Sequence, residues 1–306
     1  MERIFRSLRR NVRPNYARAA HQFRDLDAFY GNCDWIIRFF YLVSLIFSYK
    51  FISVFSHKNA DTADFLWPVA WLEFGDLKSL LVAVPIILFL VNCAVVVKYQ
   101  ARILRILFSL FCLFVAAIDN SFGAIHHVWH IWFWISFLLI FLPRPGAMGE
   151  RGYKLATLSI MVYVQAMILL FYSMAGSLKL VAGIRSLIAG EMGNFSVLGF
   201  SSLLADRMMQ GRGSTILGEV FVDNPYLGFP FFVALIFIQA FSLPVAFFPR
   251  LHRIWGLTLI GFHLGTGLLM DIFFATHILW LALFLVCSPF RIDRGTWRGI
   301  DRNWFE

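Results

Sequence analysis

The sequence predicts an all-α polytopic membrane protein with about eight transmembrane helices. Its composition is 59% hydrophobic with a mean hydropathy of +0.71, whereas soluble domains are about half apolar. Several apolar runs are long enough to cross a bilayer and contain no acidic residue. Basic residues collect in every second segment between these runs. Together, the three observations favour a membrane-embedded helical domain.

We expect a basic arm over residues 1–34, a helical membrane domain over 35–290 and a basic tail over 291–306. The apolar runs predict the individual spans, in chain order, at residues 35–56, 79–97, 102–119, 124–142, 155–183, 229–248, 254–270 and 274–290.

The charge pattern predicts the orientation of these spans. Most arginines and lysines lie in the arm, in the tail and in the loops on the same side as both. By the positive-inside rule, both termini are therefore cytoplasmic, in a cell membrane of bacterial inner-membrane type. The net charge of +9 is then mostly a topology signal. We expect membrane lipids as partners and no nucleic acid.

The longest predicted outer segment covers residues 184–228. Between Asn194 and Met208 it alternates apolar and polar side chains in a pattern typical of a short interfacial helix. A simple surface loop and a lid over an outward-facing site are the two alternative interpretations.

Lys179 is the least expected residue in the apolar runs. A lysine at the centre of a membrane helix costs roughly 2.5–3.5 kcal/mol, and such residues usually face a bundle interior or a wet cavity. Gln165, Tyr172 and Lys179 recur every seven residues and share one stripe of their helix. Ser173 and Gly176 lie beside that stripe and would allow close approach of a neighbouring helix. In the alternative interpretation, Lys179 only extends to the outer interface.

Other ionisable residues fall at the same predicted depth, near the outer ends of their spans. These candidate ligand-binding residues are His126, His127, His130, His263, Asp119 and Asp271. The histidines at 126–130 could instead form an interfacial belt with neighbouring tryptophans. A His126/His130 zinc pair is a third interpretation, but the helix lacks the acidic residue of more specific motifs, so no metal is predicted.

At these residues the chain resembles the HTTM (horizontally transferred transmembrane) domain, the membrane core of the vitamin K-dependent gamma-carboxylase family. The resemblance covers roughly residues 30–290. The family's Tyr-x-x-Ala-Gly-x-x-Lys-Leu motif matches residues 172–180, and its His-x-aromatic element matches His127 and Trp129. The Phe-His pair matches Phe262 and His263, and the Ser-Pro element matches Ser288 and Pro289.

The resemblance implies a membrane enzyme with carboxylase-like, quinol-oxygenating lyase chemistry. It implies Lys179 as the catalytic base toward a vitamin K-like quinol and His127 as its partner, with His126 or His130 as substitutes. Tyr172 and Gln165 would line the cavity. It also implies a secreted peptide as substrate and a partner protein that acts with this chain.

Two alternatives stay open. The chain could be a non-enzymatic membrane subunit that binds a partner protein or lipid, with Lys179 paired to Asp119 or to a lipid phosphate. It could also be a small transporter, although the sequence shows no internal repeat and no paired broken helices.

Overall fold

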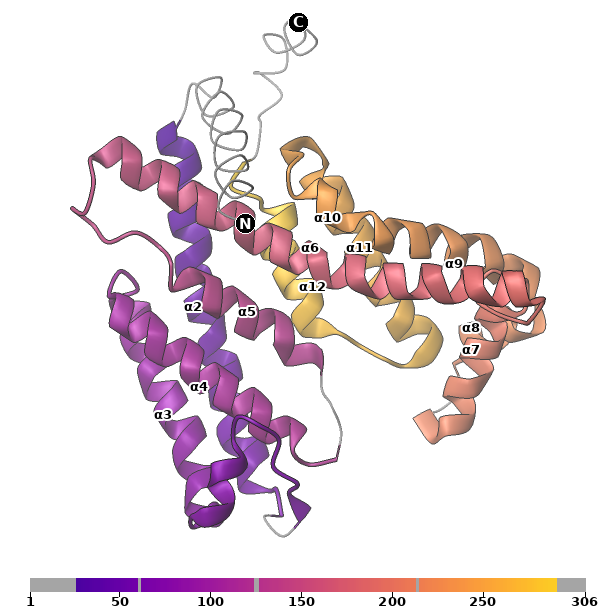
Figure 1. The fold of residues 1–306 in the computed structure, drawn as a ribbon, viewed down its shortest axis with the longest axis horizontal. Coiled ribbons are helices and arrows are strands. Elements are labelled where there is room, and N and C mark those ends of the chain that lie inside the picture. Colours follow the sequence, from indigo (N-terminus) through magenta and orange to yellow (C-terminus); the bar gives the residue numbers. More distant parts are fainter. Residues whose placement is uncertain (1–25, 60–61, 124–126, 213–214, 291–306) are drawn as a thin grey trace, which may run out of the picture.

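The computed structural model describes residues 26–59, 62–123, 127–212 and 215–290 of the chain, and within these ranges every regular element is a helix (Figure 1). This confirms the predicted helical class for the described part of the chain. Residues 1–25 of the predicted arm and the whole predicted tail lie outside these ranges.

The first half of the chain forms a bundle of long helices (Figure 1). It comprises α2 (Leu26–Ser56), α3 (Leu77–Val97) and α4 (Arg102–Asn120), with the short 3-10 helix η2 (Ala70–Phe74) before α3. Neighbours in sequence pack on each other, α2 on α3 and α3 on α4. Fully buried aromatic side chains fill the bundle, among them Phe40, Phe51 and Phe108. This packing gives the protein its main core.

Two short helices complete this bundle. A 3-10 turn, η3 (His127–Trp129), leads into α5 (His130–Leu139), and α12 (Ala275–Leu281) continues as the π-helix η5 (Ala282–Val286). Trp132 of α5 and Trp280 of α12 are fully buried in the same core. Helices α5 and α12 are thereby packed into the same core as α2.

Helix α6 (Glu150–Ala189) connects the bundle to the rest of the molecule. It has 40 residues and is about 60 Å long, twice the thickness of a bilayer core. It packs against α2 and α5 and, farther along, against α9 (Figure 1). Gly190, in the left-handed conformation with φ of 69°, ends the helix. Lys179 therefore lies beyond the core bundle, in the last third of α6.

The second group of helices surrounds this last third of α6. The group contains α7 (Gly199–Arg207), the π-helix η4 (Met208–Arg212), α8 (Ile216–Asp223), α9 (Pro225–Ala240), α10 (Ser242–Val245) and α11 (Pro249–Met270). Phe200, Leu204, Phe232 and Ile236 form a small second core there.

Four described helices are long and apolar enough to cross a membrane: α2, α3, α4 and α6. A fifth span is obtained if α8 and α9, bent by 101° at their junction, are counted together. In the described parts of regions 124–142 and 274–290, the apolar helices are shorter, His127–Leu139 and Ala275–Val286. The structure thus supports a membrane protein with four to five candidate spans, and the count of eight stays a prediction.

The predicted outer segment contains helices, as expected. Helix α7 falls within the Asn194–Met208 stretch, and α8 follows it. The position of α7 relative to a bilayer remains a prediction.

Candidate functional site

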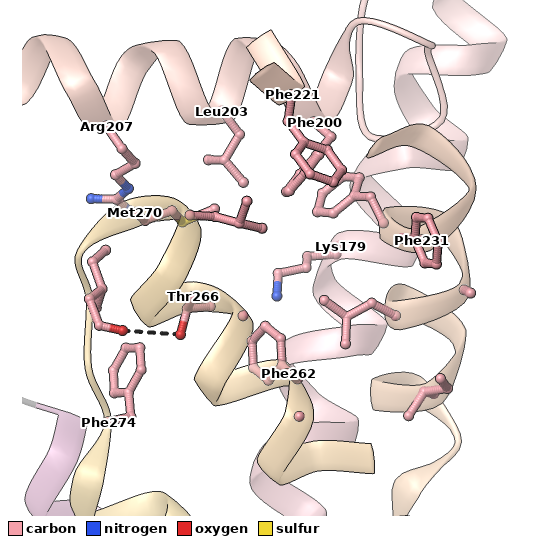
Figure 2. A pocket seen from close by; sticks show the side chains of 18 of the residues that line it. Lys179, Phe200, Leu203, Arg207, Phe221, Phe231, Phe262, Thr266, Met270 and Phe274 are labelled. Atoms are coloured by element: carbon pink, nitrogen blue, oxygen red, sulfur yellow. Dashed lines mark hydrogen bonds between the residues drawn. The ribbon is translucent and has the colours of Figure 1, made fainter. Parts of the chain in front are cut away.

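A largely apolar cavity of about 650 Å³ lies within the second group of helices (Figure 2). Its wall is made by α6, α7, α8, α9 and α11, together with the segment that follows α11. The residues that line it are Lys179, Phe200, Leu203, Arg207, Phe221, Phe231, Phe232, Ala234, Leu235, Ile238, Thr258, Gly261, Phe262, Gly265, Thr266, Leu269, Met270, Ile272 and Phe274.

Lys179 is the polar feature of α6 in this wall, and its amine points into the cavity (Figure 2). Lys179 Nζ donates a hydrogen bond of 2.8 Å to Oε1 of Gln239 on α9. Gln239 is 2% exposed. The lysine is thus held by a neutral amide oxygen instead of a carboxylate.

Two small residues of α6 bring Gln239 within reach of Lys179. A Cβ atom on Gly176 would lie 2.1 Å from the backbone nitrogen of Ala240, so the two helices touch through their backbones. Ser173 Oγ accepts a 2.7 Å hydrogen bond from the backbone N–H of Leu243, just past the end of α9. The close approach expected from Ser173 and Gly176 is confirmed.

Arg207, at the end of α7, is the second cation in the cavity wall. Its Nη1 donates a 3.1 Å hydrogen bond to Oε1 of Gln210. Gln210 in turn donates to Asp206 at 2.9 Å. The lining residues include no aspartate or glutamate. The described wall is therefore apolar with two basic side chains.

Gln165, Tyr172 and Lys179 share one stripe of α6, but each has different hydrogen-bond partners. The Tyr172 hydroxyl and His263 Nε2 share a hydrogen bond of 2.6 Å. Gln165 Nε2 donates to the backbone oxygen of Phe284 at 2.7 Å and to Ser288 Oγ at 3.1 Å. Of the stripe, only Lys179 lines the cavity.

None of the predicted histidines that the structure describes lines the cavity. His263 is 4% exposed, and its ring centroid is 5.1 Å from that of His277 and 5.1 Å from that of Phe274. His127 and His130 contact each other, with ring centroids 5.2 Å apart. Neither lines the cavity. His126 lies outside the described residues.

The two predicted aspartates, Asp119 and Asp271, lie outside the cavity wall and have other contacts. Asp119 is buried, with its Oδ1 2.7 Å from Lys58 Nζ and its Oδ2 accepting from Trp129 Nε1 at 3.1 Å. The Lys179–Asp119 pair of the alternative hypothesis is wrong, because Lys58 pairs with Asp119 and Gln239 accepts from Lys179. Asp271 caps α11 with φ of 53° and is exposed.

Within the described ranges, no three His, Cys, Asp or Glu side chains are arranged to hold a metal ion. Comparison with protein-family models, with curated proteins and with solved structures finds no match for this chain. The geometry of the cavity therefore carries the functional argument.

Sequence reasoning missed three residues that complete the polar contacts. Gln239 accepts from Lys179, Arg207 is the second basic side chain of the wall, and His252 lies beside Gln165. Ser288, named above in the Ser-Pro element, also contacts Gln165. A signal existed for Gln239, because it is a polar amide within the apolar 229–248 run. Arg207 was visible only as part of an amphipathic stretch.

Proposed function

We propose that this chain is a membrane-embedded enzyme of the HTTM type, in which Lys179 is a base toward a quinol or lipid-like ligand bound in the cavity. The observation that carries the proposal is the amine of Lys179 in the wall of an apolar cavity of about 650 Å³. Cavities of this size typically enclose small organic ligands, and a few placed polar groups fix their orientation.

The residues of the wall fit a quinol or another amphiphile. Phe231, Phe262 and Phe274 present aromatic rings, which would pack against a ligand ring or its apolar chain. Thr258 and Thr266 also line the wall. A bound quinol would supply an acidic hydroxyl and redox chemistry. Most of the binding free energy would come from burial of apolar surface.

A neutral amide is a suitable hydrogen-bond partner for a lysine that acts as a base. In its neutral form, the amine can donate one N–H to Gln239 Oε1 and keep its lone pair for a proton from the ligand. Transfer of a hydroxyl proton to Nζ would produce a ligand anion and a lysine ammonium. Gln239 Oε1 could still accept a hydrogen bond from that ammonium. A carboxylate partner would instead favour the ammonium before the ligand arrives.

The kinship with the HTTM domain is supported by a contact between two of its separate motifs. Tyr172 opens the Tyr-to-Lys motif and His263 closes the Phe-His pair, and the two share a hydrogen bond. In the proposal His263 lies next to the site, since its neighbours Phe262 and Thr266 line the cavity. In the proposal His127 is the partner that orients Lys179 or shares its proton, as the family resemblance implies.

The proposal includes eight membrane crossings with both termini in the cytoplasm of a bacterial cell, and a cavity that opens on the non-cytoplasmic side. It also includes a secreted peptide as substrate and a partner protein. The basic segments on one side support this orientation. The short helices α5 and α12 would each need neighbouring residues to complete a crossing.

Oxidation of a short-chain naphthoquinol by dissolved dioxygen, catalysed by the protein in nanodiscs, tests the proposal. We expect Lys179→Met and Lys179→Arg to reduce turnover at least about tenfold, since neither side chain accepts a proton at neutral pH. Lys78→Met removes an exposed lysine and should leave turnover unchanged. Size-exclusion profiles check that each variant is folded. Equal turnover in the wild type and both Lys179 variants refutes the base role.

A second function, lipid binding without chemistry, is favoured by the apolar character of the cavity wall. The same variants separate the two functions. A binding role needs only the positive charge, so Lys179→Arg should keep the ligand bound while Lys179→Met loses it.

A further inference from the structure

The two cations of the cavity share an unusual feature. Lys179 donates to Oε1 of Gln239 at 2.8 Å, and Arg207 donates to Oε1 of Gln210 at 3.1 Å. Each is therefore satisfied by a neutral amide. Within the described ranges, neither forms a salt bridge with a carboxylate, and no acidic residue lines the wall between them.

The half-buried guanidinium of Arg207 therefore places positive charge at an apolar cavity, and Lys179 adds to it whenever its amine is protonated. Positive charge that is partly removed from water is stabilised by an accompanying anion. The nearest acid in sequence, Asp206, is exposed and accepts from Gln210. No described carboxylate pairs with Arg207, so an anion carried by the ligand could take that place.

Arg207 is better placed than Lys179 to receive that anion. It ends α7 at the rim of the cavity, directly before the π-helix η4. Exposed apolar side chains flank α7 in sequence: Leu198, just before the helix, is 51% exposed, and Met209, just after it, is 79% exposed. Exposed apolar residues beside a cation are typical of segments that contact the lipid headgroup boundary. Figure 2 shows the Arg207 guanidinium and the Lys179 amine at separate positions along the cavity.

We propose that the ligand is an amphiphile with an anionic headgroup, a carboxylate or a phosphate, which Arg207 binds at the rim while the apolar chain extends past Lys179. A guanidinium offers paired N–H donors that match either oxyanion. Leu203 and Met270 lie between the two basic side chains in Figure 2, and Phe221 also lines the wall, so apolar surface is available to the chain. This inference rests on the cavity being the ligand site of the proposed function and narrows its ligand class.

Competition binding in nanodiscs of neutral phosphatidylcholine tests the proposal. The probes are hexadecanoate, hexadecyl phosphate and uncharged hexadecanol, each displacing a fluorescent hexadecanoate analogue. The proteins are the full-length wild type, Arg207→Gln, Arg207→Lys, Lys179→Met and Arg185→Gln. Arg185 is an exposed α6 arginine outside the cavity lining, so it is the matched control.

We expect the wild type and Arg185→Gln to bind one anionic probe at least about tenfold more tightly than hexadecanol. Arg207→Gln should lose this preference with hexadecanol binding unchanged, and Arg207→Lys should keep part of it. A preference for hexadecanoate identifies a carboxylate ligand, and one for hexadecyl phosphate identifies a phosphate ligand.

Three results would overturn the proposal. They are equal binding of all probes by the wild type, an intact preference in Arg207→Gln, and no binding of any probe. If quinol turnover still depends on Lys179 in the first two cases, only the anionic headgroup is wrong. If the preference is confirmed while turnover is insensitive to Lys179, the base role alone fails.

Discussion

At the scale of single residues, the chemistry available to Lys179 depends on its hydrogen-bond acceptor, the side-chain amide of Gln239. An amide oxygen fixes the position of the amine without adding a negative charge. A carboxylate at the same place would hold the lysine as an ammonium. Gln239 thus keeps Lys179 available either to a proton or to an anionic ligand.

Gln239→Glu tests this choice of partner. The new carboxylate should pair with Lys179 and reduce naphthoquinol turnover at least about tenfold, with a melting temperature no lower than that of the wild type. Turnover and thermal unfolding are measured on the same nanodisc samples. Wild-type turnover in Gln239→Glu would contradict a lysine that acts as a base.

The sequence pattern located Lys179 and its small neighbours but not the lysine's partners. Helical periodicity relates positions on one helix, so Ser173, Gly176 and Lys179 could be grouped correctly. It carries no information about which helix lies opposite. For this reason Gln239 was missed, and Tyr172 and Gln165 were expected beside the lysine although they bond to His263 and Ser288.

At the scale of elements, the crossing of α6 and α9 positions the site. The contact at Gly176 leaves no room for a side chain, since a Cβ there would lie 2.1 Å from the Ala240 nitrogen. Contacts between backbones of this kind are typical of helix pairs in membranes. The distance between Lys179 and Gln239 depends on this contact.

Gly176→Ala should separate the two helices, lower the melting temperature and reduce retention of the cavity ligand. Gly31→Ala in α2 is the control, since nothing lies within 4 Å of its Cβ position. It should be neutral or stabilising, by up to about 1 kcal/mol, because alanine is the better helix former. Similar melting temperatures for both variants would show that the crossing tolerates a methyl group.

Arg105 joins other elements, away from the cavity. It is 1% exposed, and its guanidinium donates to the backbone oxygens of Tyr99 at 3.0 Å and Leu142 at 2.8 Å. These acceptors follow α3 and α5, so one side chain links two helix ends. Arg105→Met should cost about 3 kcal/mol or more, since it leaves several buried carbonyls unpaired.

Urea unfolding of Arg105→Met in detergent measures that cost, and probe binding to the same sample measures the cavity. We expect a lower unfolding midpoint with the cavity ligand still bound. Loss of ligand binding at full stability would mean that Arg105 acts on the site.

The lengths of the helices within two predicted spans could not be predicted from the sequence. The runs at 124–142 and 274–290 are apolar enough for spans, but their α-helical parts are only His130–Leu139 and Ala275–Leu281. Hydropathy reports the environment of a residue and not its backbone conformation. The 3-10 turn and the π-helix at these sites arise from packing against the core, which the apolar pattern does not encode.

At the scale of the whole molecule, the helical class and the membrane character follow from composition, whereas the topology depends on charge. Helix α6 provides the test, because its two ends should lie on opposite sides of the membrane. Met148 precedes it and is 44% exposed, and Met192 follows it and is 62% exposed.

Single cysteines at these positions, in a background without Cys33, Cys93, Cys112 and Cys287, report the orientation. A membrane-impermeant maleimide added to intact cells should label Met192→Cys. It should label Met148→Cys only after permeabilisation. Labelling of both from the same side would refute a transmembrane α6.

A cryo-EM structure of the full-length protein in nanodiscs, with the co-purifying lipids and quinones identified by mass spectrometry, tests directly whether one amphiphile occupies the cavity beside Lys179. We predict an elongated density in the cavity, with one end against Arg207 and its body within hydrogen-bond reach of Lys179 Nζ. One amphiphile of matching size should be enriched in the extract. A cavity closed by side chains, with Lys179 extended to the headgroup layer and no enriched molecule, would contradict the account.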